Sequence, residues 1–239
     1  EATQPAPSIR MGDLFTIKRG LATGDNRFFI LTEEQVETLG ISRKFLTPVL
    51  PSPRYLKQDE IQADGDGLPR LEQRLFLIDC SLGEDELREA DPALARYLES
   101  GKDTVAQGYL CSSRNPWYSQ EDRPPAPLLC TYMGRADANG ERAFRFILNH
   151  SIATAANVYL LMYPKPAIRH ALAEPATAKR VFNLLKRIPM QQITGEGRVY
   201  GGGLHKLEPR ELANVPADEI AAALDNRPVT GVQMSLAHD

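Results

Sequence analysis

The 239-residue sequence is poor in cysteine and has no long apolar run. Its 3 cysteines, Cys80, Cys111 and Cys130, are widely spaced and form no Cys-x-x-Cys pair. This spacing argues against a disulfide framework and a zinc site, and it is typical of a reducing cytoplasm. The longest apolar stretch covers residues 158–163, whereas a membrane helix needs about 18 apolar residues. We therefore expect a cytoplasmic protein without a membrane partner.

The motifs of a self-contained enzyme are also missing. The sequence has no Gly-x-Ser-x-Gly nucleophile elbow, no His-Glu-x-x-His helix and no Walker loop, and its histidines are isolated. The segment Asn115-Pro-Trp-Tyr118 imitates the Asn-Pro-Pro-Tyr signature of amino-methyltransferases, but Trp117 replaces the second proline. The glycine cluster at 195–203 lacks the preceding strand of a cofactor loop. We expect no catalytic residue, metal or cofactor in this chain.

Charge is distributed unevenly along the chain, although the net charge is only −3. Residues 1–104 carry 13 Lys and Arg against 19 Asp and Glu, whereas residues 105–210 carry 14 against 7. Residues 211–239 are acidic again, with 1 against 5. A basic middle between acidic flanks indicates a localised anion-binding face, with a solvated basic surface as the alternative.

The hydrophobic pattern predicts short strands and helices without regular βαβ alternation. The expected fold class is therefore α+β, with mixed, irregular sheets and short helices. Strands are predicted at 13–19, 27–31, 75–78, 128–133, 144–148 and 157–163. Helices are predicted at 32–40, where Thr32 and Gln35 form a capping box, and at 84–100 with an interruption at Asp91-Pro92. Further helices are predicted at 177–188, 209–215 and 217–224. Residues 48–53 are predicted to be a Pro-rich connector.

An ordered set of segments carries a family resemblance over about residues 11–224. These segments are 19–29, 48–56, 114–118, 128–135, 146–157 and 197–209. In this order they resemble the C-terminal target-recognition (specificity) domains of Eco57I- and TaqI-like adenine-N6 DNA methyltransferases of restriction–modification systems. The resemblance implies a TaqI-like specificity domain at 11–225, a linker remnant at 1–10 and a flexible tail at 226–239.

The same resemblance implies a division of labour. In the family, a preceding domain binds S-adenosylmethionine and the flipped adenine, and the specificity domain grips the duplex and reads the surrounding bases. This chain has neither the cofactor loop nor the Asn-Pro-Pro-Tyr motif. The implied partners are double-stranded DNA and the N-terminal methyltransferase domain of a parent protein, which would hold the S-adenosylmethionine.

Candidate contacts to DNA come from arginines, amides, hydroxyls and aromatic rings near the predicted loops. An Arg guanidinium matches guanine or phosphate with two hydrogen bonds, Asn pairs with adenine, and aromatic rings stack on bases. The candidates are Arg19, Thr23, Asn26, Arg27, Arg114, Trp117, Tyr118, Arg135, Asn149, Thr154, Asn157, Arg198 and Lys206. We expect them to converge on one concave face. Internal ion pairs, backbone caps and a core position for Trp117 remain open alternatives.

Two other functions also remain open. The acidic flanks and Pro-rich connectors suit a protein-interaction module that docks on a methyltransferase or restriction subunit without reading DNA. An independent nuclease would need acidic metal ligands, for which Asp64, Asp66 and Glu72 are the candidates, although they also suit a solvated turn.

Overall fold

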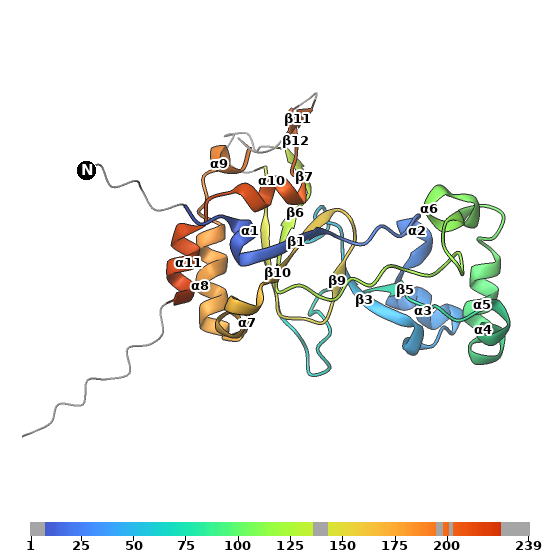
Figure 1. The fold of residues 1–239 in the computed structure, drawn as a ribbon. Helices are drawn as coiled ribbons and strands as arrows, with labels where there is room; N and C mark the ends of the chain where they lie inside the picture. Colours follow the sequence, from blue (N-terminus) through green and yellow to red (C-terminus); the bar gives the residue numbers. More distant parts are fainter. Residues whose placement is uncertain (1–7, 136–142, 195–197, 201–202, 226–239) are drawn as a thin grey trace, which may run out of the picture.

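The computed structural model describes residues 8–135, 143–194, 198–200 and 203–225. Most of the predicted linker and the whole predicted tail lie outside these residues. Short helices and mixed sheets alternate irregularly along the described chain, so the predicted α+β class is confirmed. Figure 1 shows two lobes joined by several crossing segments.

The larger lobe is built on a five-stranded sheet. Its strands, in spatial order, are β1 (Phe15–Arg19), β10 (Tyr159–Pro164), β6 (Leu128–Thr131), β8 (Phe146–Asn149) and β4 (Glu60–Ile61). Its helices are α1 (Met11–Leu14), α7 (Pro166–Ala173), α8 (Pro175–Leu185), α9 (Met190–Thr194), α10 (Pro209–Asn214) and α11 (Asp218–Asp225). Figure 1 shows α1, α7, α8, α10 and α11 gathered on one side of the sheet.

Strand alternation explains why the central strands are apolar on both faces. Leu128 and Cys130 belong to the core shared with the helices, whereas Leu129 lies in a second core on the opposite face. The 3 cysteines are buried and unpaired, and burial raises the pKa of the Cys130 thiol. They therefore serve as small apolar side chains, the usual role of a buried free cysteine.

The smaller lobe holds a four-stranded sheet of order β2 (Ile30–Thr32), β5 (Leu75–Ile78), β3 (Leu46–Leu50) and β9 (Thr154–Ala155). Its helices are α2 (Asn26–Phe29), α3 (Glu33–Leu39), α4 (Glu84–Ala90), α5 (Pro92–Glu99) and α6 (Tyr109–Ser112), with 3-10 turns at Arg43–Phe45 and Val105–Gln107. The predicted capping box of Thr32 and Gln35 is confirmed, and Gly40 ends α3 with φ 71°.

Two local predictions in this lobe are wrong. Residues 26–29 are helical rather than extended, because the Asp25 carboxylate accepts a hydrogen bond from the Arg27 N–H and starts a turn. The predicted connector at 48–53 begins inside β3, where Pro48 lies opposite Phe76 of β5. Pairing with distant strands overrides the proline signal in this segment.

A three-stranded sheet extends the larger lobe, with the order β11 (Arg198–Tyr200), β12 (Leu204–Lys206) and β7 (Met133–Arg135). The strand predicted at 128–133 therefore divides at Tyr132 into β6 and β7. Within the described residues, no helix combines the length and apolar character that a bilayer crossing requires.

The lobes meet where the chain leaves β1. The Gly20 N–H donates to the Tyr159 carbonyl at 2.9 Å, and the Leu21 N–H donates to the Ala155 carbonyl at 3.0 Å. A Cβ at position 20 would lie 2.2 Å from the Ala156 oxygen, so only glycine allows this approach. The contact places Leu21 in the core of the smaller lobe.

Candidate nucleic-acid interface

Arg114 braces a loop instead of facing solvent. Its guanidinium donates to the carbonyls of Ala22 at 2.6 Å and Thr23 at 2.8 Å, and to the Gln120 amide oxygen at 3.3 Å. These bonds hold residues 20–25 against the segment after α6. We therefore assign Arg114 to the support of this loop, because its bonds to Ala22, Thr23 and Gln120 use most of its N–H donors inside the protein.

Three more polar candidates lie inside the fold. The Thr23 side chain is 1% exposed and donates to the Asn26 amide oxygen at 2.7 Å. Asn149 is 5% exposed and bonds the carbonyls of Ala126 and Ala153, and Thr154 is 2% exposed. Buried side chains do not reach a ligand at the surface, so these three are removed from the candidate contacts.

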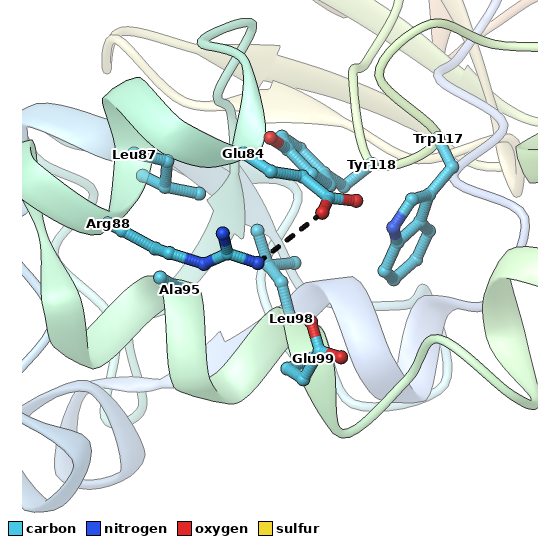
Figure 2. Close-up of a pocket in the computed structure, with 8 residues that line it drawn as sticks. All are labelled: Glu84, Leu87, Arg88, Ala95, Leu98, Glu99, Trp117 and Tyr118. Carbon is cyan, nitrogen blue, oxygen red and sulfur yellow. Dashed lines mark ion pairs between the residues drawn. The ribbon is translucent and has the colours of Figure 1, made fainter.

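Trp117 and Tyr118 belong to the core of the smaller lobe rather than to an exposed loop (Figure 2). The Trp117 ring lies 6.0 Å from both Phe28 and Phe29, centroid to centroid. The Tyr118 hydroxyl donates to the Leu82 carbonyl at 2.6 Å, and burial raises its pKa to about 12. The cavity beside them measures about 20 Å³, room for about one water, so a base does not fit into it.

The first group of candidates surrounds the buried Tyr132, and we call it the Tyr132 cluster: Arg19, Tyr132, Lys206 and Glu208. Arg19 is exposed, whereas Lys206 and Glu208 are half-buried. The Arg19 guanidinium carbon lies 4.0 Å from the ring centroid, and the Lys206 ammonium lies 5.4 Å from it. Cations over an aromatic face gain about 0.5–1 kcal/mol at exposed sites. Arg19 also donates to the Asn157 carbonyl at 3.1 Å. One ring thus positions two cations.

The Glu208 carboxylate compensates part of the positive charge of Arg19 and Lys206. It accepts from the Tyr132 hydroxyl at 2.8 Å and pairs with Lys206 at 2.8 Å. Burial alone would raise the pKa of Glu208, but the hydrogen bonds from Lys206 and Tyr132 outweigh it and leave the pKa below its ordinary value. The bond to Glu208 raises the pKa of Lys206, so both groups are charged at neutral pH.

Strand β7 carries the positive surface beyond the cluster. Arg135 is exposed and its side chain makes no hydrogen bond or ion pair with another described residue, and Met133 is 43% exposed. Lys206 lies opposite Met133 in the strand register, and Arg198 lies opposite Lys206. The side chain of Arg198 is outside the described atoms, so its predicted contact rests on register alone.

The second exposed group lies at one end of the smaller lobe, and we call it the α2–α6 tip: Asn26, Arg27 and Tyr109. The Arg27 side chain is 95% exposed, with its nearest carboxylate, Asp25, 3.9 Å away. Tyr109 is 86% exposed. Helix α6 packs on the loop before α2, since the Cys111 sulfur lies 3.8 Å from the Thr23 oxygen (Figure 1).

Tyr109 is the contact candidate that sequence reasoning missed. It adjoins Leu110 and the buried Cys111 in a segment without apolar periodicity, so nothing local marks it as exposed. Trp117, eight residues further on, has the stronger aromatic signal but is partly buried against Phe28 and Phe29. Only the packing of the helices distinguishes the two.

Much of the basic central third is neutralised internally. Asp59 pairs with Arg145 at 2.7 Å and with Lys186 at 3.3 Å, and Glu60 pairs with Lys179. The exposed candidates therefore form two groups on different lobes, the Tyr132 cluster with β7 and the α2–α6 tip. The structure does not gather all predicted cations on one surface.

The predicted nuclease acids do not converge either. Asp64 accepts hydrogen bonds from two turn N–H groups and pairs with Arg74 at 2.7 Å, and the exposed Glu72 pairs with Lys57 at 3.5 Å. No group of three potential metal-ligating side chains occurs in the described part of the chain. Asp64 therefore closes a turn in this structure.

Comparison with known proteins finds type II methyltransferases both by family model and by sequence similarity. The family model for the C-terminal domain of type II methyltransferase M.Eco57I matches residues 1–236. Type II methyltransferase M.XamI of Xanthomonas campestris pv. amaranthicola is 32% identical over 87% of this chain and 36% of that protein. Type II methyltransferase M.AccI of Acinetobacter calcoaceticus is 25% identical over 82% of this chain and 34% of that protein.

Among solved structures, the type IIL restriction-modification enzyme MmeI in complex with DNA aligns with a TM-score of 0.42 and 10% identity. The alignment covers 74% of this chain and 23% of that one. So weak a likeness carries no argument. The chain spans about a third of the length of the curated relatives it matches.

Proposed function

The chain belongs to the family of M.Eco57I-type C-terminal domains of type II methyltransferases, and from this premise we propose that it is a target-recognition domain. In this proposal it binds duplex DNA and reads the bases around the target of an adenine-N6 methyltransferase. The catalytic domain and its S-adenosylmethionine belong to the remainder of a longer parent protein. This chain supplies no catalytic residue.

The observation that carries the proposal is the α2–α6 tip in a chain of this family. Arg27 offers its guanidinium to solvent, and the Asn26 amide oxygen accepts from Thr23, which leaves the amide nitrogen as a donor. Tyr109 adds an exposed aromatic ring on α6, the helix that packs on the loop before α2. Arg and Asn read base edges, and aromatic rings stack on or wedge between bases.

The Tyr132 cluster supports a different kind of contact. Arg19 and Lys206 are fixed over one ring, and Arg135 follows on β7. Half to two-thirds of protein–DNA hydrogen bonds go to phosphate and sugar and set the position of the protein on the duplex. We assign the Tyr132 cluster to backbone contacts and the tip to base contacts.

Duplex binding is tested by fluorescence anisotropy with the whole chain, first with a pool of random duplexes and then with selected sequences. The affinity should fall with salt, with a log–log slope of about −0.9 for each phosphate contact. Enrichment of one sequence through repeated selection tests base reading. Absence of binding to any duplex at low salt would overturn the proposal.

The variant Arg27→Ala should weaken binding to the selected duplex by about 1–3 kcal/mol and relax the preference at one base pair. The matched control is Arg96→Ala, because Arg96 is also exposed but lies on α5. Equal losses for the two variants would show that Arg27 acts only as one surface charge among others.

A protein-docking role without DNA reading predicts another pattern. Binding to a methyltransferase partner would then be insensitive to salt and to added duplex, and Arg27→Ala would leave it unchanged. The two readouts therefore separate the functions in one set of variants.

A further inference from the structure

A basic pocket opens beside the edge strand β1, apart from the two groups described above. Its volume is about 260 Å³. Lys18 enters from β1, Arg123 from the segment before β6, and Lys165 and Arg169 from the start of α7. Asp122 is the one carboxylate among the described residues that line it.

Three of the four cations that line this pocket have no partner for their side chains among the described residues. Lys18, Lys165 and Arg169 form no hydrogen bond or ion pair through their side chains with any residue in the described ranges. Arg123 pairs with Glu121 at 2.5 Å, and its Nε donates to the Arg19 carbonyl at 3.2 Å. Clustered like charges repel one another, and a bound anion relieves that repulsion.

The walls of the pocket are stiff. Pro124, Pro164 and Pro166 line it, and proline fixes the backbone φ angle. The Tyr163 hydroxyl donates to the Pro124 carbonyl at 2.8 Å and ties the loop to β10. Helix α7 starts at Pro166 without a side-chain cap, so the positive end of its dipole adds to the same region. The pocket is therefore preformed for an anion.

The size and position of the pocket indicate which anion. Its volume lies below the range of about 300–1,000 Å³ for pockets that enclose drug-sized ligands, but it exceeds the space of a few waters. Lys18 of the pocket and Arg19 of the Tyr132 cluster are consecutive residues that point to opposite faces of β1, so the pocket lies across this edge strand from the cluster. Arg123 joins the two surfaces through the Arg19 carbonyl.

We propose that this pocket binds a phosphate group, and that the phosphate belongs to the backbone of the duplex, an assignment that rests on the proposed function. The bound phosphate sits between Lys18 and Arg169, and Lys165 and Arg123 add two further positive charges to the pocket. It anchors the duplex without reading sequence. A free phosphate ion is the other source with the same chemistry, and the test separates them.

The test compares the whole chain with the double variant Lys18→Ala/Arg169→Ala in salt-dependent anisotropy titrations. The double variant should show a log–log slope smaller in magnitude by about 0.9, equal for all duplex sequences. The control is Arg70→Ala/Arg96→Ala, which removes two exposed cations elsewhere and should retain the wild-type slope. Thermal melting checks that both variants are folded.

A second measurement uses inorganic phosphate at constant ionic strength and follows the amide NMR signals of residues 163–169. Shifts in the wild type that disappear in the pocket variant support a phosphate site. Such shifts with an unchanged duplex slope would overturn the backbone source in favour of free phosphate. If the wild type binds duplex but shows neither the phosphate-induced shifts nor a slope change in the double variant, the pocket proposal alone is overturned. If the wild type binds no duplex, the proposed function and the backbone source are overturned together.

Discussion

Arginine serves opposite roles at two positions in this protein. Arg114 uses its fork to bind two carbonyls of one loop, at 2.6 and 2.8 Å, whereas Arg27 lies at the surface with 95% of its side chain exposed. The loop that Arg114 braces carries Asn26 and Arg27 into the α2–α6 tip. One arginine therefore supports the loop that presents the other at the surface.

Replacement of Arg114 by alanine should destabilise the protein by about 1.5–3 kcal/mol, because it removes charge-assisted bonds and leaves the Ala22 and Thr23 carbonyls without them. Urea unfolding measures the change, with Arg27→Ala as the control that should unfold like the wild type. Arg114→Lys should recover only part of the loss, because an ammonium lacks the planar fork. An unchanged unfolding curve combined with lost DNA binding would instead make Arg114 a direct contact.

Two acidic residues, Asp59 immediately before β4 and Glu60 in it, join elements of the larger lobe. Asp59 pairs with Arg145 before β8 and with Lys186 after α8, and Glu60 pairs with Lys179 of α8. His150 also lies 3.2 Å from the Glu60 carboxylate. The two-residue strand β4 thereby connects the sheet to its longest described helix, with charges on each side.

These ion pairs predict that the stability of the fold depends on pH. The hydrogen bond from Lys179, opposed by burial and aided by His150, lowers the pKa of Glu60 from 4.5. A carboxyl with a lowered folded pKa stabilises the fold above its unfolded pKa, and this contribution is lost as pH falls through the folded pKa. Glu60→Gln should therefore be less stable than the wild type at pH 7, by about 1 kcal/mol.

The two proteins should approach equal stability when pH falls below the folded pKa of Glu60, since a protonated Glu resembles Gln. Urea unfolding from pH 7 down to pH 3 measures this convergence. A constant difference across the range would show that Glu60 contributes through packing instead of charge.

The whole molecule depends on the joint between its lobes. The backbone at Gly20 and Leu21 bonds to Tyr159 and Ala155, so the chain leaving β1 is held against the chain entering β10. The Tyr132 cluster lies at the end of β1, and the α2–α6 tip begins a few residues beyond the joint. A duplex that touches both groups requires this joint to hold them at a fixed spacing.

Gly20→Ala should destabilise the protein by about 1–3 kcal/mol, because the added methyl would meet the Ala156 carbonyl at 2.2 Å and force the lobes apart. The control is Gly65→Ala, where no atom lies within 4 Å of the added Cβ. Urea unfolding measures stability, and the anisotropy assay measures duplex affinity. If Gly20→Ala behaved like its control, the joint would be looser than its geometry indicates.

The sequence by itself determined the features that depend on neighbouring residues. Thr32, Gln35 and Gly40 delimit α3, and Asp91 caps α5 immediately before Pro92, because capping bonds act within one turn. Continuous apolar runs predicted β5 and most of β6 and β10, since a strand buried on both faces needs no polar alternation. The family assignment also follows from ordered local segments.

Only the tertiary structure decided which candidate side chains remain exposed. Arg114 finds its carbonyl partner 91 residues away in the sequence, and Asp59 meets Arg145 across 86 residues. The four cations of the β1 pocket likewise come from three separate segments. Burial and charge pairing depend on distances in space, which an isolated sequence pattern does not contain, and so only the folded chain shows which candidate side chains are exposed.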